Sequence, residues 1–139
     1  MDFDVLLWIV AGVIATVIMT IPQLVQIYFQ GKNAVPEFTE NAYILSRLTG
    51  GEWEQLYWKA VPLHFGHGIL GAFLYGGGLV ILSIEISILT SFLYGLILWL
   101  SLLLTHERIT GENIYANRNG MFGSFLWHQA YSFAFLLVI

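Results

Sequence analysis

The feature that most constrains this chain is a long apolar stretch, from Ala60 to Thr105, that contains a single charged residue, Glu85. A soluble domain cannot hide so much apolar surface, because small domains bury only about two-thirds of the surface of the unfolded chain. The whole sequence shares this bias: of its 139 residues, 58% are hydrophobic and 10% are charged, whereas soluble domains carry about a quarter charged residues. We therefore predict one all-α domain that lies in a lipid bilayer.

Four segments fit the length of a membrane-spanning helix, which needs roughly 20 mainly apolar residues. The stretch that begins at Ala60 is too long for one span and fits two, with a tight hairpin around Glu85. The predicted spans are residues 5–29, 60–82, 86–105 and 120–139. The first is expected to be a mature helix, because a signal peptide opens with positive charge rather than with Asp2 and Asp4. The predicted fold is a bundle of four transmembrane helices.

The basic residues predict an orientation for this bundle, since cytoplasmic loops are enriched in Lys and Arg. All five lie in the two loops that an even number of spans puts on one side: Lys32, Arg47 and Lys59 in the first, Arg108 and Arg118 in the second. We therefore predict that the N- and C-termini are non-cytoplasmic, in a multi-pass protein of a cell membrane.

The longer of these loops has a predicted helix of its own, at residues 40–48. Thr39 can cap its N-terminus, Gly50 follows its end, and Pro36 is expected to lie outside it. Aromatic residues follow before the second span, as they do where helices meet headgroups. An amphipathic helix lying on the membrane surface is the favoured interpretation, and a docking platform for a partner is the alternative.

Each predicted span carries small residues at four-residue spacing, which allows helices to approach closely in lipid. On the second span this small-residue seam consists of Gly68, Ala72 and Gly76, with His64 one turn before it. The corresponding positions elsewhere are Gly12, Thr16 and Thr20 on the first span, Ser91 and Gly95 on the third, and Gly120, Ser124 and Ser132 on the fourth. Such seams predict helix packing rather than chemistry.

A group of polar residues near one end of the spans forms the candidate ligand-binding site. Ionisable and amide side chains inside the hydrocarbon region are costly and usually face the interior of a bundle. The group comprises His64, His67, His128, His106, Glu107, Gln23 and Gln26. His64 and His128 lie on the small-residue seams, so we predict that their rings face each other in the cytoplasmic half of the bundle, with His67 within reach.

Several roles are open for these histidines. Imidazoles on facing helices can ligate a haem iron, or a metal ion together with Glu107. They can also relay protons or hydrogen-bond a quinone. The plainest alternative is that they only cross-link helices by hydrogen bonds. The cofactor prediction therefore stays open, with haem and a metal ion as its candidates.

Other classes of chemistry find no support in the sequence. Cysteine is absent, which excludes disulfides and thiolate chemistry, and no basic patch suggests nucleic acid as a partner. The glycine run at 76–78 lies within a predicted span, unlike a phosphate-binding loop, which follows a strand. No catalytic residue is therefore assigned.

Short patterns spread over the spans resemble a known family. They are the run from Gly12 to Thr20, the run from His64 to Gly68 with Gly71, the pairs Tyr75-Gly76 and Tyr94-Gly95, and His128. In these the chain is similar to the poorly characterised four-helix inner-membrane proteins related to YagU, a bacterial acid-resistance protein. The resemblance implies a prokaryotic plasma-membrane location, and it carries over no catalytic residue.

For function, we expect a non-enzymatic membrane protein, either an accessory subunit of a larger complex or a small oligomer. Its expected partners are the lipid bilayer and other membrane subunits, or further copies of itself. One alternative is a redox subunit that binds haem, a metal or a quinone through its histidines. Another is a small transporter or channel subunit, which would have to oligomerise because four short helices enclose little water.

Overall fold

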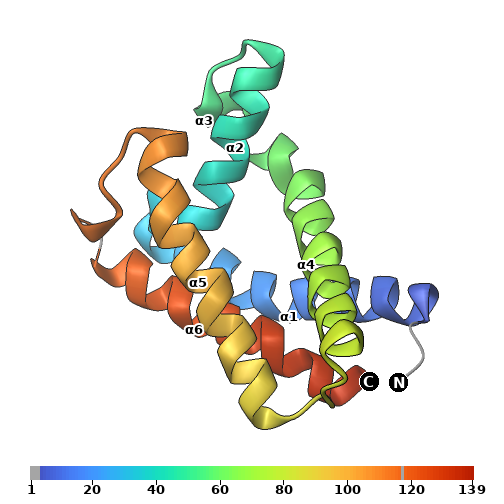
Figure 1. The fold of residues 1–139 in the computed structure, drawn as a ribbon. Coiled ribbons are helices and arrows are strands. Elements are labelled where there is room, and N and C mark those ends of the chain that lie inside the picture. The colour runs from blue at the N-terminus through green and yellow to red at the C-terminus, as the bar shows by residue number, and fades with distance from the viewer. Residues whose placement is uncertain (1–3, 117) are drawn as a thin grey trace.

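The computed structural model describes residues 4–116 and 118–139, and all regular structure among them is helical (Figure 1). The long helices are α1 (Val5–Gln30), α4 (Val61–Leu82), α5 (Ile88–Thr110) and α6 (Arg118–Val138). The shorter ones are η1 (Lys32–Ala34), α2 (Pro36–Thr49), α3 (Trp53–Leu56), η2 (Trp58–Ala60) and η3 (Ile114–Ala116). The all-α prediction is confirmed for this part of the chain.

Three helical segments of the described chain are long and apolar enough to cross a membrane: α1, the continuous segment Trp58–Leu82, and α5. They correspond to the first three predicted spans and are consistent with a membrane location. The last helix, α6, has a similar length, but His128 and Gln129 lower its mean hydropathy. It is also the most enclosed of the long helices, so these polar side chains lie against protein rather than lipid.

The chain turns sharply between α4 and α5, at the residues where the sequence predicts a hairpin. Ser83 ends α4 in the left-handed conformation, with a φ of 54°. Ser87 opens α5 with a capping box, in which its hydroxyl accepts from the Thr90 amide at 3.2 Å and its own amide donates to Thr90 Oγ1 at 2.8 Å. Because both ends of the link are capped, the hairpin is short and well defined.

Helix α1 is the centre of the packing, since it lies against both α4 and α6, while α5 packs on α6. An apolar cluster around the rings of Trp8, Tyr75 and Phe135 fills the space between them. By contrast, α4 and α5 are joined by the hairpin yet diverge from it, and α2 lies at the far end of α4 (Figure 1). These two helices are therefore neighbours in the chain that do not pack closely along their length.

The small-residue seam of α4 faces α1 at very short range. A Cβ atom added at Gly76 would lie 2.3 Å from the Trp8 indole, and one added at Gly12 would lie 2.9 Å from the Ala72 Cβ. At Gly68 an added Cβ would overlap the Thr16 hydroxyl, at 1.9 Å. These glycines let the two helices approach more closely than any larger residue would allow.

Helix α2 begins earlier than the sequence predicts, and the predicted cap is wrong. Pro36 is the first helical residue, where its missing N–H group would have had no helical partner in any case. Val35 is the N-cap, and Thr39 lies inside the first turns, where its hydroxyl donates to the Val35 carbonyl at 3.3 Å. The helix therefore reads from Pro36 to Thr49 rather than from Glu40.

The first half of α2 is buried in the protein. Phe38 and Ala42 are fully buried in a second apolar cluster with Ile27 of α1 and Tyr57. The rings of Phe38 and Tyr57 stack with centroids 6.0 Å apart. This cluster holds α2 against the bundle, so that its opposite, polar face meets α4, α5 and α6.

Candidate functional site

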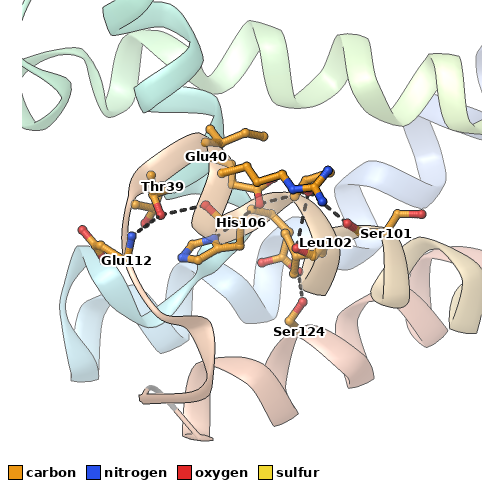
Figure 2. A network of polar contacts seen from close by, with 12 residues as sticks. Thr39, Glu40, Ser101, Leu102, His106, Glu112 and Ser124 are labelled. Atoms are coloured by element: carbon orange, nitrogen blue, oxygen red, sulfur yellow. Dashed lines mark hydrogen bonds and ion pairs between the residues drawn. The ribbon is translucent and has the colours of Figure 1, made fainter.

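The polar face of α2 carries Glu37, Glu40 and Asn41, which lie together because residues three and four apart share one side of a helix. Each of these side chains approaches a histidine on a different long helix: His128 on α6, His106 on α5 and His64 on α4. Figure 2 shows Glu40, His106 and Ser124 in this network, where α2 meets α5 and α6. One short helix thus connects three long ones through polar contacts.

The Glu37 contact joins α2 to α6. Its Oε1 lies 3.3 Å from His128 Nδ1 and accepts a short hydrogen bond from the Ser124 hydroxyl. His128 Nδ1 also lies 2.9 Å from the carbonyl oxygen of Ser124. The Ser124 hydroxyl, which donates to Glu37, is a third neighbour of Nδ1 at 3.3 Å. All three neighbours can accept, so Nδ1 carries a proton, and Nε2 is left without a contact to them.

The Glu40 contact joins α2 to α5. Its Oε1 lies 3.4 Å from His106 Nδ1 and accepts from the Thr105 hydroxyl at 3.3 Å. Burial raises the pKa of Glu40 above its ordinary value of 4.5, and the nearby Glu37 adds to this, while His106 and Thr105 oppose it. The environment of Glu40 therefore favours its neutral form.

The Asn41 contact joins α2 to α4 and, through the imidazole, to α1. Asn41 Nδ2 lies 3.5 Å from His64 Nδ1, and His64 Nε2 lies 3.2 Å from Thr20 Oγ1. The amide nitrogen is a donor, so Nδ1 accepts and Nε2 donates to Thr20. Phe38 covers the ring, with centroids 4.5 Å apart. Both nitrogens of His64 are thereby used in holding helices together.

Below this polar face of α2 lies a cavity of about 260 Å³, which we call the histidine cavity. Its lining comes from every long helix and from α2. The residues are Thr16 and Met19 of α1; Glu37, Glu40 and Asn41 of α2; His64, His67, Gly68 and Gly71 of α4; Leu98, Ser101, Leu102 and Thr105 of α5; and His128 and Tyr131 of α6.

The histidine cavity opens between α4 and α5. The lining residues from α1 and α6 are buried, whereas His67 of α4 and both Ser101 and Thr105 of α5 are exposed. His67 lies about 13 Å along the helical segment from Trp58, by the rise of 1.5 Å per residue. The mouth therefore faces sideways, between two of the helices that are long and apolar enough to cross a membrane.

One atom on the cavity wall has no partner. Glu37 is 7% exposed, and its Oε2 is buried without a hydrogen-bond partner among the described residues. A carboxylate oxygen in this position normally accepts at least one hydrogen bond, since an unpaired buried charge is costly. Glu37 therefore brings to the cavity lining a carboxyl group with one oxygen that the described residues do not satisfy.

The structure brings some of the predicted site residues together and separates others. His64, His67 and His128 line the histidine cavity, and His106 lies behind Glu40. Glu107 is exposed on the outer side of α5.

The two glutamines of α1 lie elsewhere. Gln26 connects α1 to α6, because its Oε1 accepts from Trp127 Nε1 at 2.8 Å and its Nε2 donates to the Ala34 carbonyl at 2.9 Å. Gln23 is fully buried, and neither polar atom of its side chain has a partner in the described residues.

The small residues of α6 have two different roles. Ser132 meets α5, where a Cβ added at Gly95 would lie 2.5 Å from its hydroxyl. Ser124, on the same seam, contacts Glu37 instead, and Gly120 is buried near the start of the helix. The fourth seam thus packs at one end and supports the polar network at the other.

Sequence reasoning missed Glu37, Glu40 and Asn41. The signal was present in their spacing and in Pro36, which is common at the first position of a helix. With the helix started at Pro36, the three polar residues fall on one face opposite Phe38 and Ala42. Placing Pro36 outside the helix concealed this amphipathic pattern.

Within residues 4–116 and 118–139 no three histidine or carboxylate side chains are grouped so that they could share a metal ion. Comparisons with protein-family models, with curated proteins and with solved structures find no match. The geometry of the histidine cavity is therefore the observation from which function is inferred.

Proposed function

We propose that this protein is a non-enzymatic integral membrane protein that binds a small ligand in the histidine cavity. The observation that carries the proposal is the cavity itself, which is lined by three histidines and two glutamates on helices of a membrane protein. Ionisable groups at this depth are expensive and are generally retained for a ligand or ion path. Hydrogen bonds between helices alone would need no such space.

We propose four membrane helices, with α6 as the fourth. Its 21 residues extend about 31 Å, close to the thickness of roughly 30 Å of a hydrocarbon core. It packs on α1 and α5, both apolar enough to span. Shielding by these helices supports a spanning position for a helix with His128 and Gln129 in its middle.

Two contacts support the proposal that the basic loops lie on one side and the termini on the other. Arg47 donates to the carbonyl oxygen of Ile109 at 2.6 Å, and the Tyr43 hydroxyl donates to Glu112 at 3.2 Å. They tie the segment between α1 and α4 to the segment between α5 and α6. With the enrichment of basic residues in cytoplasmic loops, this favours a cytoplasmic position for both segments, in the plasma membrane of a prokaryote.

The size of the histidine cavity favours a small ligand or the polar head of a larger one. At about 260 Å³ it lies below the roughly 300–1,000 Å³ of typical ligand and cofactor sites. A haem macrocycle would need the helices to move apart. A compact polar group fits the space, with the rest of the ligand leaving through the mouth between α4 and α5.

The test is whether the protein retains a small molecule through this cavity. Protein extracted from membranes in native lipid discs should carry a bound molecule that mass spectrometry detects. Ser101→Trp, at the exposed mouth, should lose it, whereas Leu100→Trp on the neighbouring lipid-facing position should keep it. Retention of the same molecule by both variants, or its absence from the unaltered protein, would contradict the proposal.

A further inference from the structure

We propose that the histidine cavity binds the protonated amino group of an amphiphilic molecule, with Glu37 Oε2 as its acceptor and its apolar tail in the lipid. This deepens the proposed function and rests on it, because it names the chemical class of the ligand. The inference comes from the donors and acceptors on the cavity wall, from the charges around them and from the direction of the mouth.

Two acceptors remain available among the buried residues that line the cavity. Glu37 Oε2 has no partner among the described residues, and His128 presents Nε2, because its Nδ1 is held by Glu37 and Ser124. Several donors of the lining are already used: the Tyr131 hydroxyl donates to the Gly68 carbonyl, and both nitrogens of His64 are engaged. His67, which can donate or accept, lies at the exposed mouth. A ligand that only accepts hydrogen bonds, such as a quinone, would meet the lone pairs of Glu37 and His128, whereas a ligand with several N–H donors is complementary to them.

The charges point to a cation rather than to a neutral donor. Glu37 and Glu40 form ion pairs only with His128 and His106 among the described residues, and no Lys or Arg side chain pairs with either. The Glu37 carboxyl group therefore has no permanently charged partner in the described residues, and an ammonium group would supply both a positive charge and hydrogen-bond donors.

The mouth determines the remainder of the ligand. It opens between α4 and α5 toward lipid, and the cavity walls near it include the apolar side chains of Leu98 and Leu102. An alkyl chain attached to the amine can leave along this side and remain in the bilayer. A phospholipid headgroup would also bring a phosphate toward the Glu37 carboxylate, so like charges oppose it. The chemistry is that of a long-chain amine without a phosphate.

The experiment uses the full-length protein in discs of phosphatidylcholine and measures Tm as probe is added. Dodecylamine should raise Tm in a saturable way. Dodecanol, with the same chain and no charge, and propylamine, with the same amine and no chain, should each bind at least about tenfold more weakly, because each lacks one part of the recognition. Glu37→Gln should weaken dodecylamine binding by at least about tenfold, as expected for loss of a charge-assisted hydrogen bond. Glu107→Gln, an exposed glutamate on α5, should bind like the unaltered protein.

Three results would overturn the inference: equal binding of dodecylamine by Glu37→Gln and the unaltered protein, equal binding of dodecanol, or equal binding of propylamine. If Glu37→Gln does not fold, Ser101→Trp at the mouth replaces it, with Leu100→Trp as the control, and unchanged binding by Ser101→Trp has the same meaning. The absence of any dodecylamine effect also refutes this ligand class. In that case a different molecule retained in native discs, and lost in Ser101→Trp, would still support the proposed function.

Discussion

Helix α4 meets its two neighbours in opposite ways. Against α1 it presents Gly68, Ala72 and Gly76, and the backbones approach so closely that added Cβ atoms would overlap Trp8 and Thr16. Against α5, to which the hairpin joins it, a cavity remains. Lipid supplies no hydrophobic force that would close such a space. The difference teaches that the separation of α4 and α5 has to be built from specific side chains.

Side chains support this separation at both ends. Near the hairpin the rings of Tyr75 and Tyr94 stack with centroids 4.5 Å apart, and the Tyr94 hydroxyl donates to the Gly71 carbonyl at 2.6 Å. At the other end Glu40 and Asn41 of α2 contact α5 and α4. Large aromatic residues and an inserted helix thus hold these two helices apart.

The strongest test of the close packing between α1 and α4 is Gly76→Ala. The new methyl group would lie 2.3 Å from the Trp8 indole, which is fully enclosed and cannot move aside freely. Overpacking of this kind costs about 1–3 kcal/mol, so Tm in detergent should fall clearly. Gly77→Ala is the matched control, because nothing lies within 4 Å of its added Cβ. Equal stability of the two variants would mean that α1 and α4 are not closely packed.

At the histidine cavity, we expect His128→Ala to lower the free energy of unfolding by less, about 1 kcal/mol, as for other hydrogen bonds inside membrane proteins. The substitution removes the contact with Glu37 but leaves the apolar packing of α6 unchanged. His67→Ala provides the comparison, because His67 is exposed at the mouth and should leave stability unchanged. Chemical unfolding in mixed micelles measures both. A larger loss of stability for His67→Ala than for His128→Ala would contradict the role of the His128 contact with Glu37.

The polar contacts of α2 should also make stability depend on pH through Glu40. Because burial raises its pKa above 4.5, the folded state holds the proton more tightly than the unfolded chain. This contribution is complete below about pH 4.5 and is lost as pH rises through the raised pKa. Glu40→Gln should remove this decline, so the variant should gain stability relative to the unaltered protein toward neutral pH.

The groups that face Glu40 are His106 and Thr105 of α5 and Glu37 of α2. Thermal unfolding between pH 4 and pH 8 measures the effect, and the exposed Glu107→Gln should follow the unaltered protein. A decline with pH that is identical in Glu40→Gln would assign it to other groups.

Cysteine substitutions at exposed positions should have the smallest effect on stability. Their labelling tests the orientation of the helices most directly. The chain has no cysteine of its own, so single substitutions at the exposed residues Thr49, Tyr115 and Ile84 give unambiguous sites. Thr49→Cys and Tyr115→Cys should react with an impermeant maleimide from the cytoplasmic side, and Ile84→Cys from the other. Labelling of Thr49 and Tyr115 from opposite sides would contradict four spans.

The face of α4 that packs on α1 could be predicted from the sequence, whereas the face that lines the cavity toward α5 could be predicted only in part. Four-residue spacing of Gly68, Ala72 and Gly76 is a local property of one helix, so its face could be predicted without knowing the partner. The same reasoning predicted that His64 and His128 face the interior, and both line one cavity. The helical character of the described chain and the position of the hairpin followed from hydropathy alone.

The carboxylates of the site were not predicted from the sequence, because their role depends on tertiary structure. In sequence Glu37 and Glu40 belong to a polar loop, and polar loops are usually solvated. Glu37 and Glu40 face the bundle only because Phe38 and Ala42, on the same helix, pack against α1 and Tyr57. Conversely Glu107, beside His106 in sequence, faces outward, because adjacent residues on a helix point about 100° apart.

The reach of α2 across the fold has a consequence for how the protein is made. Ser124 and Glu37 are 87 positions apart in the chain, and α2 leaves the ribosome well before α4, α5 and α6 exist to receive it. Until then its carboxylates have to stay in water or among headgroups, since lipid would reject them. The polar contacts of α2 with α4, α5 and α6 can therefore form only after these later helices have been made.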